Sequence, residues 1–295
     1  MKRQLKLTKK KIQVLRLRQK LWIQKLTRQR LTLKFAGDAK GIDVFYWWGA
    51  GTAKKLVDAG KVMALDDYVT DDVKSKILEG STSAFEFDGK LYSVPMFSWY
   101  MTLFCNKTMF DKAGATLPTT YDELVDAVKK LKKLDGVIPM AAGAKDGWNA
   151  AFVYQALALR EVGATGVNEM LSGKKEFGDE GFKKAAQKVS DLYEMGAFGD
   201  NPLEQGNDDA NAAFENGKAA MRLMGSWFAN NVYTDDAATI KPEEVVALKI
   251  PTIADGKVKQ QITVVDSLNH SGLTITLNTK KKQLSSVFNI NEKWA

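Results

Sequence analysis

The chain has 295 residues, of which 45% are hydrophobic and 26% are charged, a composition typical of a globular protein with a substantial core. No stretch approaches the roughly 18 consecutive apolar residues that a membrane-spanning helix needs. Cys105 is the only cysteine, which excludes an intrachain disulfide and a cysteine-cluster metal site. His270 is the only histidine and lies in a turn-like stretch. We therefore expect no catalytic residues, no metal site and no cofactor.

The formal charge of +8 is concentrated at one end of the chain. Residues 1–37 contain 13 Lys or Arg and no acid, which leaves 30 basic against 35 acidic residues in the remainder. Such a distribution indicates a local basic arm, not a basic binding face. Apolar residues near heptad spacing allow an amphipathic helix in residues 1–34, but no segment of matching pattern stands out as its partner. We expect this arm to be dispensable for folding of the body.

From residue 35 onward, strand and helix patterns alternate. Residues 43–48 form an aromatic strand, and residues 52–59 form a short helix before Gly60. An Asp-Gly turn predicts a hairpin within residues 85–95, and residues 101–105 form another strand. Later helices are expected after a capping box at Thr120 and Glu123 and over residues 149–160, 182–194 and 208–216. This order predicts an α/β protein with layered lobes.

Nucleotide and calcium motifs are not encoded. Gly49 and Gly51 follow a strand, but Lys54 stands where a dinucleotide-binding turn needs a small residue. The acidic pairs at 66–67, 71–72 and 208–209 lack the spacing of a calcium loop, so they are interpreted as surface carboxylates.

Five tryptophans attract attention because they lie at strand ends or beside Gly, Ser, Pro or Asp. They are Trp47, Trp48, Trp99, Trp148 and Trp227. Rings at such positions face a ligand cleft in one interpretation and fill the core in the other.

Four motifs in a fixed order then point to a family. The segment LFCNKTMFDKAG at 103–114, running on to PTTYDEL at 118–124, resembles the signature of family 1 bacterial extracellular solute-binding proteins. Residues 89–95, the run 213–221 with its continuation at 225–227, and Ile250-Pro251 resemble further motifs of that family. The resemblance covers residues 35–282.

The resemblance implies a type II periplasmic-binding-protein fold, similar to maltose-binding proteins, with two α/β lobes and a ligand cleft between them. It places lobe one at residues 35–104 plus 263–295, lobe two at 105–262, and the basic arm 1–34 outside the pattern. It implies the substrate-binding component of an ABC importer that binds a sugar in an aromatic-lined cleft. The candidate ligand-binding residues are Trp47, Trp48, Trp99, Trp148, Trp227, Asp43, Asn106 and Asp146, with Asn149 as a further polar candidate. The polar candidates are equally well interpreted as turn or capping residues.

The expected partners are a sugar and the membrane permease subunits of an ABC importer, with no nucleic acid, and the protein is expected to be a monomer. The resemblance implies an extracytoplasmic, membrane-associated location, although no signal peptide or lipoprotein cysteine is visible in this chain. Both ends depart from the family pattern, so we expect them to be altered by frameshift, truncation or a mispredicted reading frame around an intact middle. Two alternatives remain at this stage: an adaptor that docks its basic arm on nucleic acid or anionic membrane, and an enzyme acting on sugars.

Overall fold

The computed structural model describes residues 24–37, 42, 44–78, 80–97, 99–234, 238–258 and 271–275. The chain divides into two compact units, a smaller one of Met1–Ser98 with Asp266–Ala295 and a larger one of Trp99–Val265. The larger unit thus begins six residues before the boundary expected after residue 104. The reason is that strand β5 (Met101–Asn106) pairs on both sides with strands of the larger unit.

The larger unit is built on a four-stranded sheet with the order β6-β7-β5-β8. Its other strands are β6 (Ile138–Ala141), β7 (Ala219–Gly225) and β8 (Val245–Leu248). Strands β6 and β7 run parallel, whereas β5 is antiparallel to both β7 and β8. Every residue of β5 and β7 is buried, because layers of helices cover both faces of the sheet.

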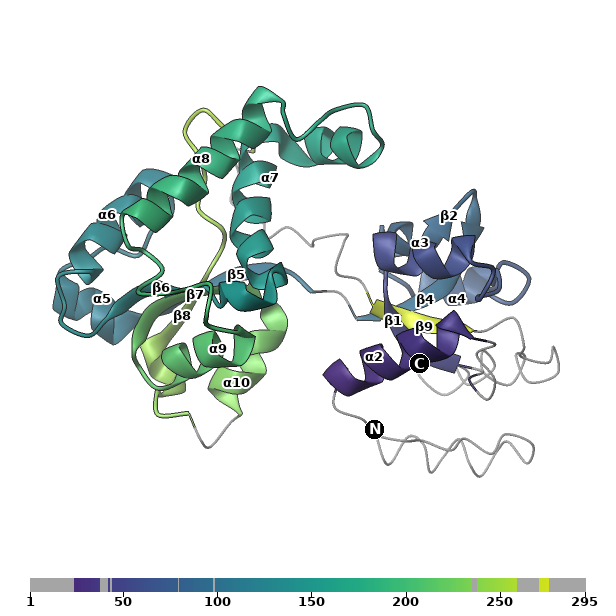
Figure 1. Ribbon diagram of the computed structural model, residues 1–295, viewed down its shortest axis with the longest axis horizontal. Coiled ribbons are helices and arrows are strands. Elements are labelled where there is room, and N and C mark those ends of the chain that lie inside the picture. Colours follow the sequence, from purple (N-terminus) through teal and green to yellow (C-terminus); the bar gives the residue numbers. More distant parts are fainter. Residues whose placement is uncertain are drawn as a thin grey trace. The chain divides into compact units, whose positions relative to one another are not determined.

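Helices α6 (Tyr121–Leu131), α7 (Trp148–Leu171) and α8 (Glu180–Glu194) cover the sheet face that bears Leu103. Phe104, the next residue along β5, faces the other side and packs its ring on Phe228 at 5.2 Å. Phe228 in turn contacts Phe214 of α9 (Asn207–Glu215). The unit is therefore a three-layered α/β structure, as the sequence predicts (Figure 1). The unit also contains the helices α5 (Lys107–Ala113) and α10 (Ala229–Tyr233) and the short turns η2 (Ala144–Asp146), η3 (Ser226–Phe228) and η4 (Pro242–Glu244).

Local sequence signals set the ends of several helices. The predicted capping box is confirmed at α6, where the Thr120 side chain accepts from the Glu123 amide and the Glu123 carboxylate accepts from the Thr120 amide. Helix α5 is followed by Gly114, whose φ of 59° lies in the left-handed region that favours glycine. Helix α7 continues beyond the expected residue 160 to Leu171, and it changes direction at Gly163, where φ is 71°.

The smaller unit contains a three-stranded antiparallel sheet with the order β1-β9-β4. Its strands are β1 (Val44–Trp48), β4 (Ser93–Phe97) and β9 (Ser271–Ile275), so the central strand comes from the far end of the chain. The predicted hairpin is confirmed as β2 (Glu86–Phe87) and β3 (Lys90–Leu91). Asp88 and Gly89 between them both have positive φ, the conformation of a type I′ turn.

Helix α2 (Gln24–Ala36) spans the end of the basic arm and the start of the body. Leu31, in the arm, is partly buried against the core of the smaller unit, and Phe35, the first residue of the expected body, is buried within that core. These two residues lie one turn apart and therefore share one face of the helix. Helices α3 (Ala50–Asp58) and α4 (Asp71–Ser75) and the turn η1 (Ser83–Phe85) also belong to this unit. Across the described residues, no helix is both long enough and apolar enough to cross a bilayer.

Candidate ligand-binding surface

One edge of the larger sheet brings together three segments that are far apart in sequence. Met101, at the start of β5, pairs with Gly225 at the end of β7, so Trp99 and Trp227 leave the sheet at the same edge. Strand β6 runs parallel to β7, and its carboxyl end therefore leads into the same edge. The loop that follows β6 carries η2 and then Trp148, the first residue of α7.

Four aromatic side chains form a continuous cluster at this edge, which we call the aromatic cluster: Trp99, Trp148, Phe152 and Trp227. The Trp99 and Trp227 rings meet edge to face with centroids 5.6 Å apart. Phe152 of α7 lies 6.0 Å from Trp227 and 5.2 Å from Trp148. These separations are those of favourable aromatic pairs, each contributing about 0.5–1.5 kcal/mol beyond area burial.

The solvent exposure of the rings in the aromatic cluster increases from the core to the surface. Phe152 is 5% exposed, Trp99 and Trp227 are partly buried, and Trp148 is 41% exposed. Tyr100, beside Trp99, is also exposed. Rings in this arrangement are held by a buried base while part of their area faces water, which suits a ligand with apolar faces and a polar rim.

The Trp227 ring folds back over the backbone of Gly225. A Cβ atom at Gly225 would lie only 2.0 Å from the ring, so this close approach requires glycine. The Ser226 amide donates to the Tyr100 carbonyl at 2.8 Å and anchors the turn to the start of β5. Glycine and the anchored turn together fix the indole at the strand end, where the sequence predicts it.

The polar candidates around η2 lie at the same edge, but their visible contacts are structural. Asp146 is exposed, and its Oδ2 accepts from the Asn207 amide at 2.6 Å, which tethers the η2 loop to the start of α9. Asn149 is 2% exposed and its Oδ1 accepts from Arg222 at 3.0 Å. Phe152 and Arg222 were missed in the sequence analysis. Arg222 carried a usable signal, because it is the one charged residue in the buried strand β7.

Asn106 is not brought to this edge. It ends β5 at the opposite end from Trp99, about 17 Å along the strand from Met101 at roughly 3.4 Å per residue. Its buried side chain accepts from the Met109 amide at 3.2 Å and caps α5. The capping alternative therefore describes the contact that the structure gives this residue.

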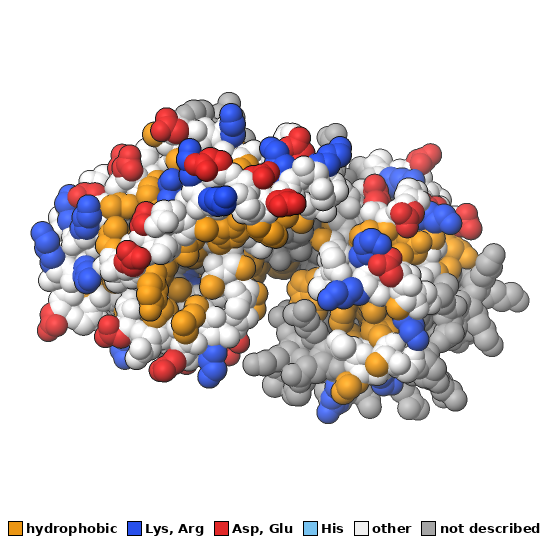
Figure 2. Space-filling model, turned by 45° about the horizontal axis from the view of Figure 1, so that its top comes forward, with side chains coloured by type: hydrophobic (Ala, Val, Ile, Leu, Met, Phe, Trp, Pro, Cys, Tyr) orange, Lys and Arg blue, Asp and Glu red, His pale blue; other side chains and the backbone are white. Residues whose placement is uncertain are grey.

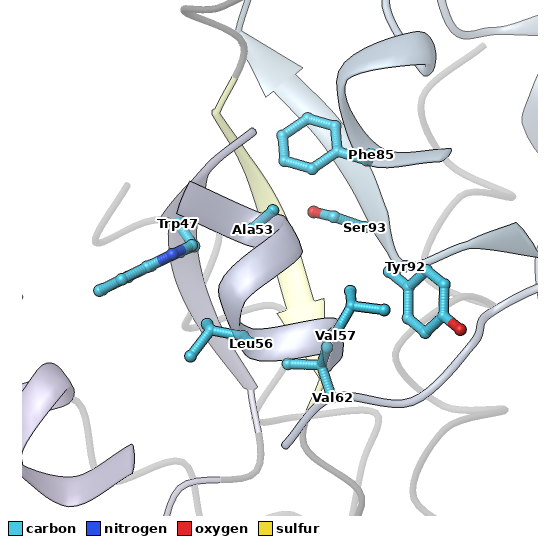
Figure 3. Close-up of a pocket in the computed structure, with 8 residues that line it drawn as sticks. All are labelled: Trp47, Ala53, Leu56, Val57, Val62, Phe85, Tyr92 and Ser93. Carbon is cyan, nitrogen blue, oxygen red and sulfur yellow. The ribbon is translucent and has the colours of Figure 1, made fainter. Parts of the chain in front are cut away.

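Trp47 and Trp48 belong to the smaller unit. Trp47 is 5% exposed, packs 6.1 Å from Phe35, and donates from its Nε1 to the Thr52 carbonyl at 3.3 Å. Figure 3 shows its ring lining a pocket with α3 and β4 residues, and this pocket is too narrow to hold a water molecule. Trp48 is partly buried and contacts Trp47 and Tyr46. Asp43 and His270 lie outside the described residues.

Charge on the described surface is mixed. Figure 2 shows Lys and Arg interspersed with Asp and Glu on the face that it displays, with orange apolar patches between them. Within the described ranges, no group of His, Cys, Asp or Glu is arranged to hold a metal ion. The distinctive polar feature is the buried guanidinium of Arg222, whose pKa is lowered to about 9 by burial and raised in part by Glu215.

Comparison with known proteins identifies the fold of this chain. The family model for bacterial extracellular solute-binding proteins matches residues 25–287, ten residues earlier than the start of the resemblance, so the end of the basic arm lies inside the family pattern. A structure solved in work on xylan utilisation by Caldanaerobius polysaccharolyticus superimposes with a TM-score of 0.85 at 31% identity. The match covers 98% of this chain and 72% of the chain in the solved structure. The fold is therefore the predicted type II periplasmic-binding-protein fold.

Two curated relatives are similar in sequence. An uncharacterized ABC transporter extracellular-binding protein of Pyrococcus horikoshii is 24% identical over 90% of this chain and 64% of its own length. A multiple sugar-binding protein of Streptococcus mutans is 28% identical over 48% of this chain and 35% of its own length. The chain thus spans less than two thirds of the length of these relatives.

Proposed function

We propose that this chain, which belongs to the bacterial extracellular solute-binding proteins, binds a sugar against the aromatic cluster of its larger unit and performs no chemistry on it. The observation that carries the proposal is the graded cluster itself. Phe152 fixes the base, while Trp99, Trp148 and Trp227 offer ring area at the edge of the sheet. Sugars present apolar C–H faces between hydroxyl groups, and flat rings with a few nearby polar groups complement them.

The relatives support the sugar class. One is named for binding multiple sugars, and the similar solved structure comes from work on xylan utilisation. We propose further that the chain delivers its ligand to the permease subunits of an ABC importer, works outside the cytoplasm, and acts as a monomer without binding nucleic acid. The two units are proposed to be the two lobes expected from the sequence, with the first lobe ending before Trp99. No observation on the described residues favours the adaptor or the sugar-cleaving alternative.

Thermal unfolding of the full chain with a panel of sugars tests the binding class. Xylotriose, maltotriose and glucose serve as probes, and sorbitol serves as an osmolyte control. A sugar present at 100 times its dissociation constant adds about 2.7 kcal/mol to the free energy of unfolding. We expect at least one sugar to raise the unfolding temperature at concentrations where sorbitol does not.

Point variants then locate the site. Trp148→Ala removes the most exposed ring of the cluster and is expected to weaken sugar binding about tenfold or more while leaving the fold intact. Tyr193→Ala, which removes an exposed ring from α8, is the matched control and should leave affinity unchanged. Unchanged affinity in Trp148→Ala and in the corresponding Trp227→Ala variant would show that the sugar binds elsewhere.

A further inference from the structure

We propose that Arg222 is a positioning residue that sets the place of Trp148 in the aromatic cluster by tying the start of α7 to strand β7. Arg222 is 1% exposed and comes from the middle of β7. Its side chain lies on the same sheet face as its register partner Phe104, the face covered by α9. It touches no ring of the cluster in the contacts described, so its influence passes through other residues.

The guanidinium joins three separate segments. It donates to five oxygens at 3.0–3.3 Å, all of them neutral: the carbonyls of Ala141 and Ala142 and the side-chain oxygens of Asn149, Asn207 and Asn211. The two carbonyls lie at the end of β6 and just after it, and Asn149 is the second residue of α7. Asn207 begins α9, and Asn211 lies one turn further along that helix. A planar guanidinium with five donors in fixed directions can hold such a set, whereas an ammonium group offers only three donors at one point.

Trp148 is the residue next to Asn149, which makes the tie relevant to the ligand surface. Both polar atoms of the Asn149 side chain are hydrogen-bonded, since its Oδ1 accepts from Arg222 and its Nδ2 donates to Asn207 Oδ1 at 3.3 Å. Trp148 itself is 41% exposed, and among the aromatic pairs of the described residues its ring has only Phe152 as a partner. A ring with so little packing takes its position from its backbone, and that backbone is held by Asn149.

Two further contacts fix the loop that precedes Trp148. Asp146 accepts from the Asn207 amide at 2.6 Å. A Cβ atom at Gly143 would stand only 2.7 Å from the Gly206 carbonyl oxygen, so the η2 loop and the start of α9 are in close contact. These contacts hold the middle of the loop, whereas Arg222 holds both of its ends, at Ala142 and at Asn149.

The energetic setting makes this tie sensitive to substitution. Burial disfavours the charged form of Arg222, and the acceptors compensate with hydrogen bonds and not with a carboxylate in direct contact. Removing the guanidinium leaves several buried oxygens without donors, which the segment relieves by moving. The consequence for ligand binding rests on the proposed function. The effect of Arg222 on the position of Trp148 is independent of it.

The test follows the ring directly and needs no ligand. The full chain is labelled with 5-fluorotryptophan, and the Trp148 resonance is assigned by its loss in Trp148→Phe. Arg222→Lys is expected to shift or broaden the Trp148 resonance while Trp47 and Trp48, in the smaller unit, keep their wild-type signals. Arg160→Lys is the matched control, because Arg160 is an equally buried arginine of the same unit, 12 residues along α7.

Asn207→Ala provides a milder variant if Arg222→Lys does not fold. It removes one acceptor of the guanidinium and one partner of Asn149, and it should move the Trp148 resonance in the same direction by a smaller amount. A Trp148 resonance that stays at its wild-type position and width in the folded variants, or that moves equally in Arg160→Lys, overturns the proposal. If a probe sugar binds, Arg222→Lys should weaken it about tenfold in the wild-type background and much less in Trp148→Ala, as coupled residues do. Failure of every sugar to bind would count against the proposed function and leave the resonance test unaffected.

Discussion

Gly225→Ala is the smallest change that should displace a ring of the aromatic cluster. The new Cβ would lie 2.0, 2.2 and 2.4 Å from three carbons of the Trp227 ring. Carbon atoms in ordinary contact are about 3.5 Å apart, so the indole must move by about 1.5 Å or rotate away. The backbone at Gly225 has φ −67° and ψ 154°, which alanine adopts without strain. The ring, not the strand, must therefore absorb the change.

The size of the effect follows from the contacts that the ring loses. Trp227 pairs with Trp99 at 5.6 Å and with Phe152 at 6.0 Å, and each aromatic pair contributes about 0.5–1.5 kcal/mol. Losing both destabilises the fold by about 1–3 kcal/mol, against which the stiffer unfolded chain of an alanine variant returns about 0.4–1 kcal/mol. We expect a net loss of up to about 2.5 kcal/mol of unfolding free energy, estimated from the same pair and chain terms.

Three measurements on one variant check this reasoning. Near-UV circular dichroism should lose the signal of the Trp99 and Trp227 pair, urea unfolding should give the stability change, and titration should show about tenfold weaker sugar binding. Gly178→Ala is the matched control, because a Cβ there meets nothing within 4 Å. A Gly225→Ala variant with a wild-type dichroism spectrum and affinity would refute the placement of the ring over Gly225.

Three further predictions concern other parts of the chain. Phe35→Ala should cost about 3–5 kcal/mol of stability by urea unfolding, because it empties a core position of the smaller unit, whereas Leu33→Ala in the same helix, at a 73% exposed position, should cost little. The Glu123 carboxylate accepts from the Thr119 amide, which lowers its pKa below 4.5, so its contribution to stability is present above that pH and is lost as the pH falls. Glu123→Gln should flatten the acid limb of a pH–stability profile, and an unchanged limb would contradict the capping contact. Cys105 is fully buried, and burial raises the pKa of its thiol, so a thiol reagent should label it only on unfolding, and rapid labelling of the native protein would contradict the burial.

Much of the fold could be predicted because local signals and family motifs agree. The Asp88-Gly89 turn and the Thr120 capping box each determine their element within a few residues, and both are confirmed. The order of elements could not be reached in the same way. The sequence does not reveal that strand β9 inserts between β1 and β4, because pairing between segments as far apart as Val44 and Ile275, or Ser93 and Thr274, leaves no local pattern. The contact of Leu31 in the basic arm with the core of the smaller unit was likewise not predicted, because the Lys and Arg residues around it mask the pattern of apolar positions.

The candidate site could also be predicted only in part. Strand ends and small neighbours marked Trp99, Trp148 and Trp227, and these rings do lie at one sheet edge. The same signals marked Trp47, which the structure places in the core of the smaller unit. Side-chain direction separates these cases, because successive residues of a strand point to opposite faces and a sequence does not say which face is covered.

A charged residue in a buried strand gives further information about which strand ends border a ligand surface. Arg222 interrupts a strand that is otherwise apolar, and the free-energy penalty for burying a guanidinium means that such a residue persists only where acceptors surround it. Its acceptors here come from the ends of β6, α7 and α9, the segments that border the aromatic cluster. An isolated arginine in a buried strand therefore indicates a place where loops converge, which is also where a ligand surface is built from several strand ends. The neighbours of the tryptophans differ accordingly. Trp148 and Trp227 border the segments tied by Arg222, whereas Trp47 packs among apolar side chains of β1 and α3.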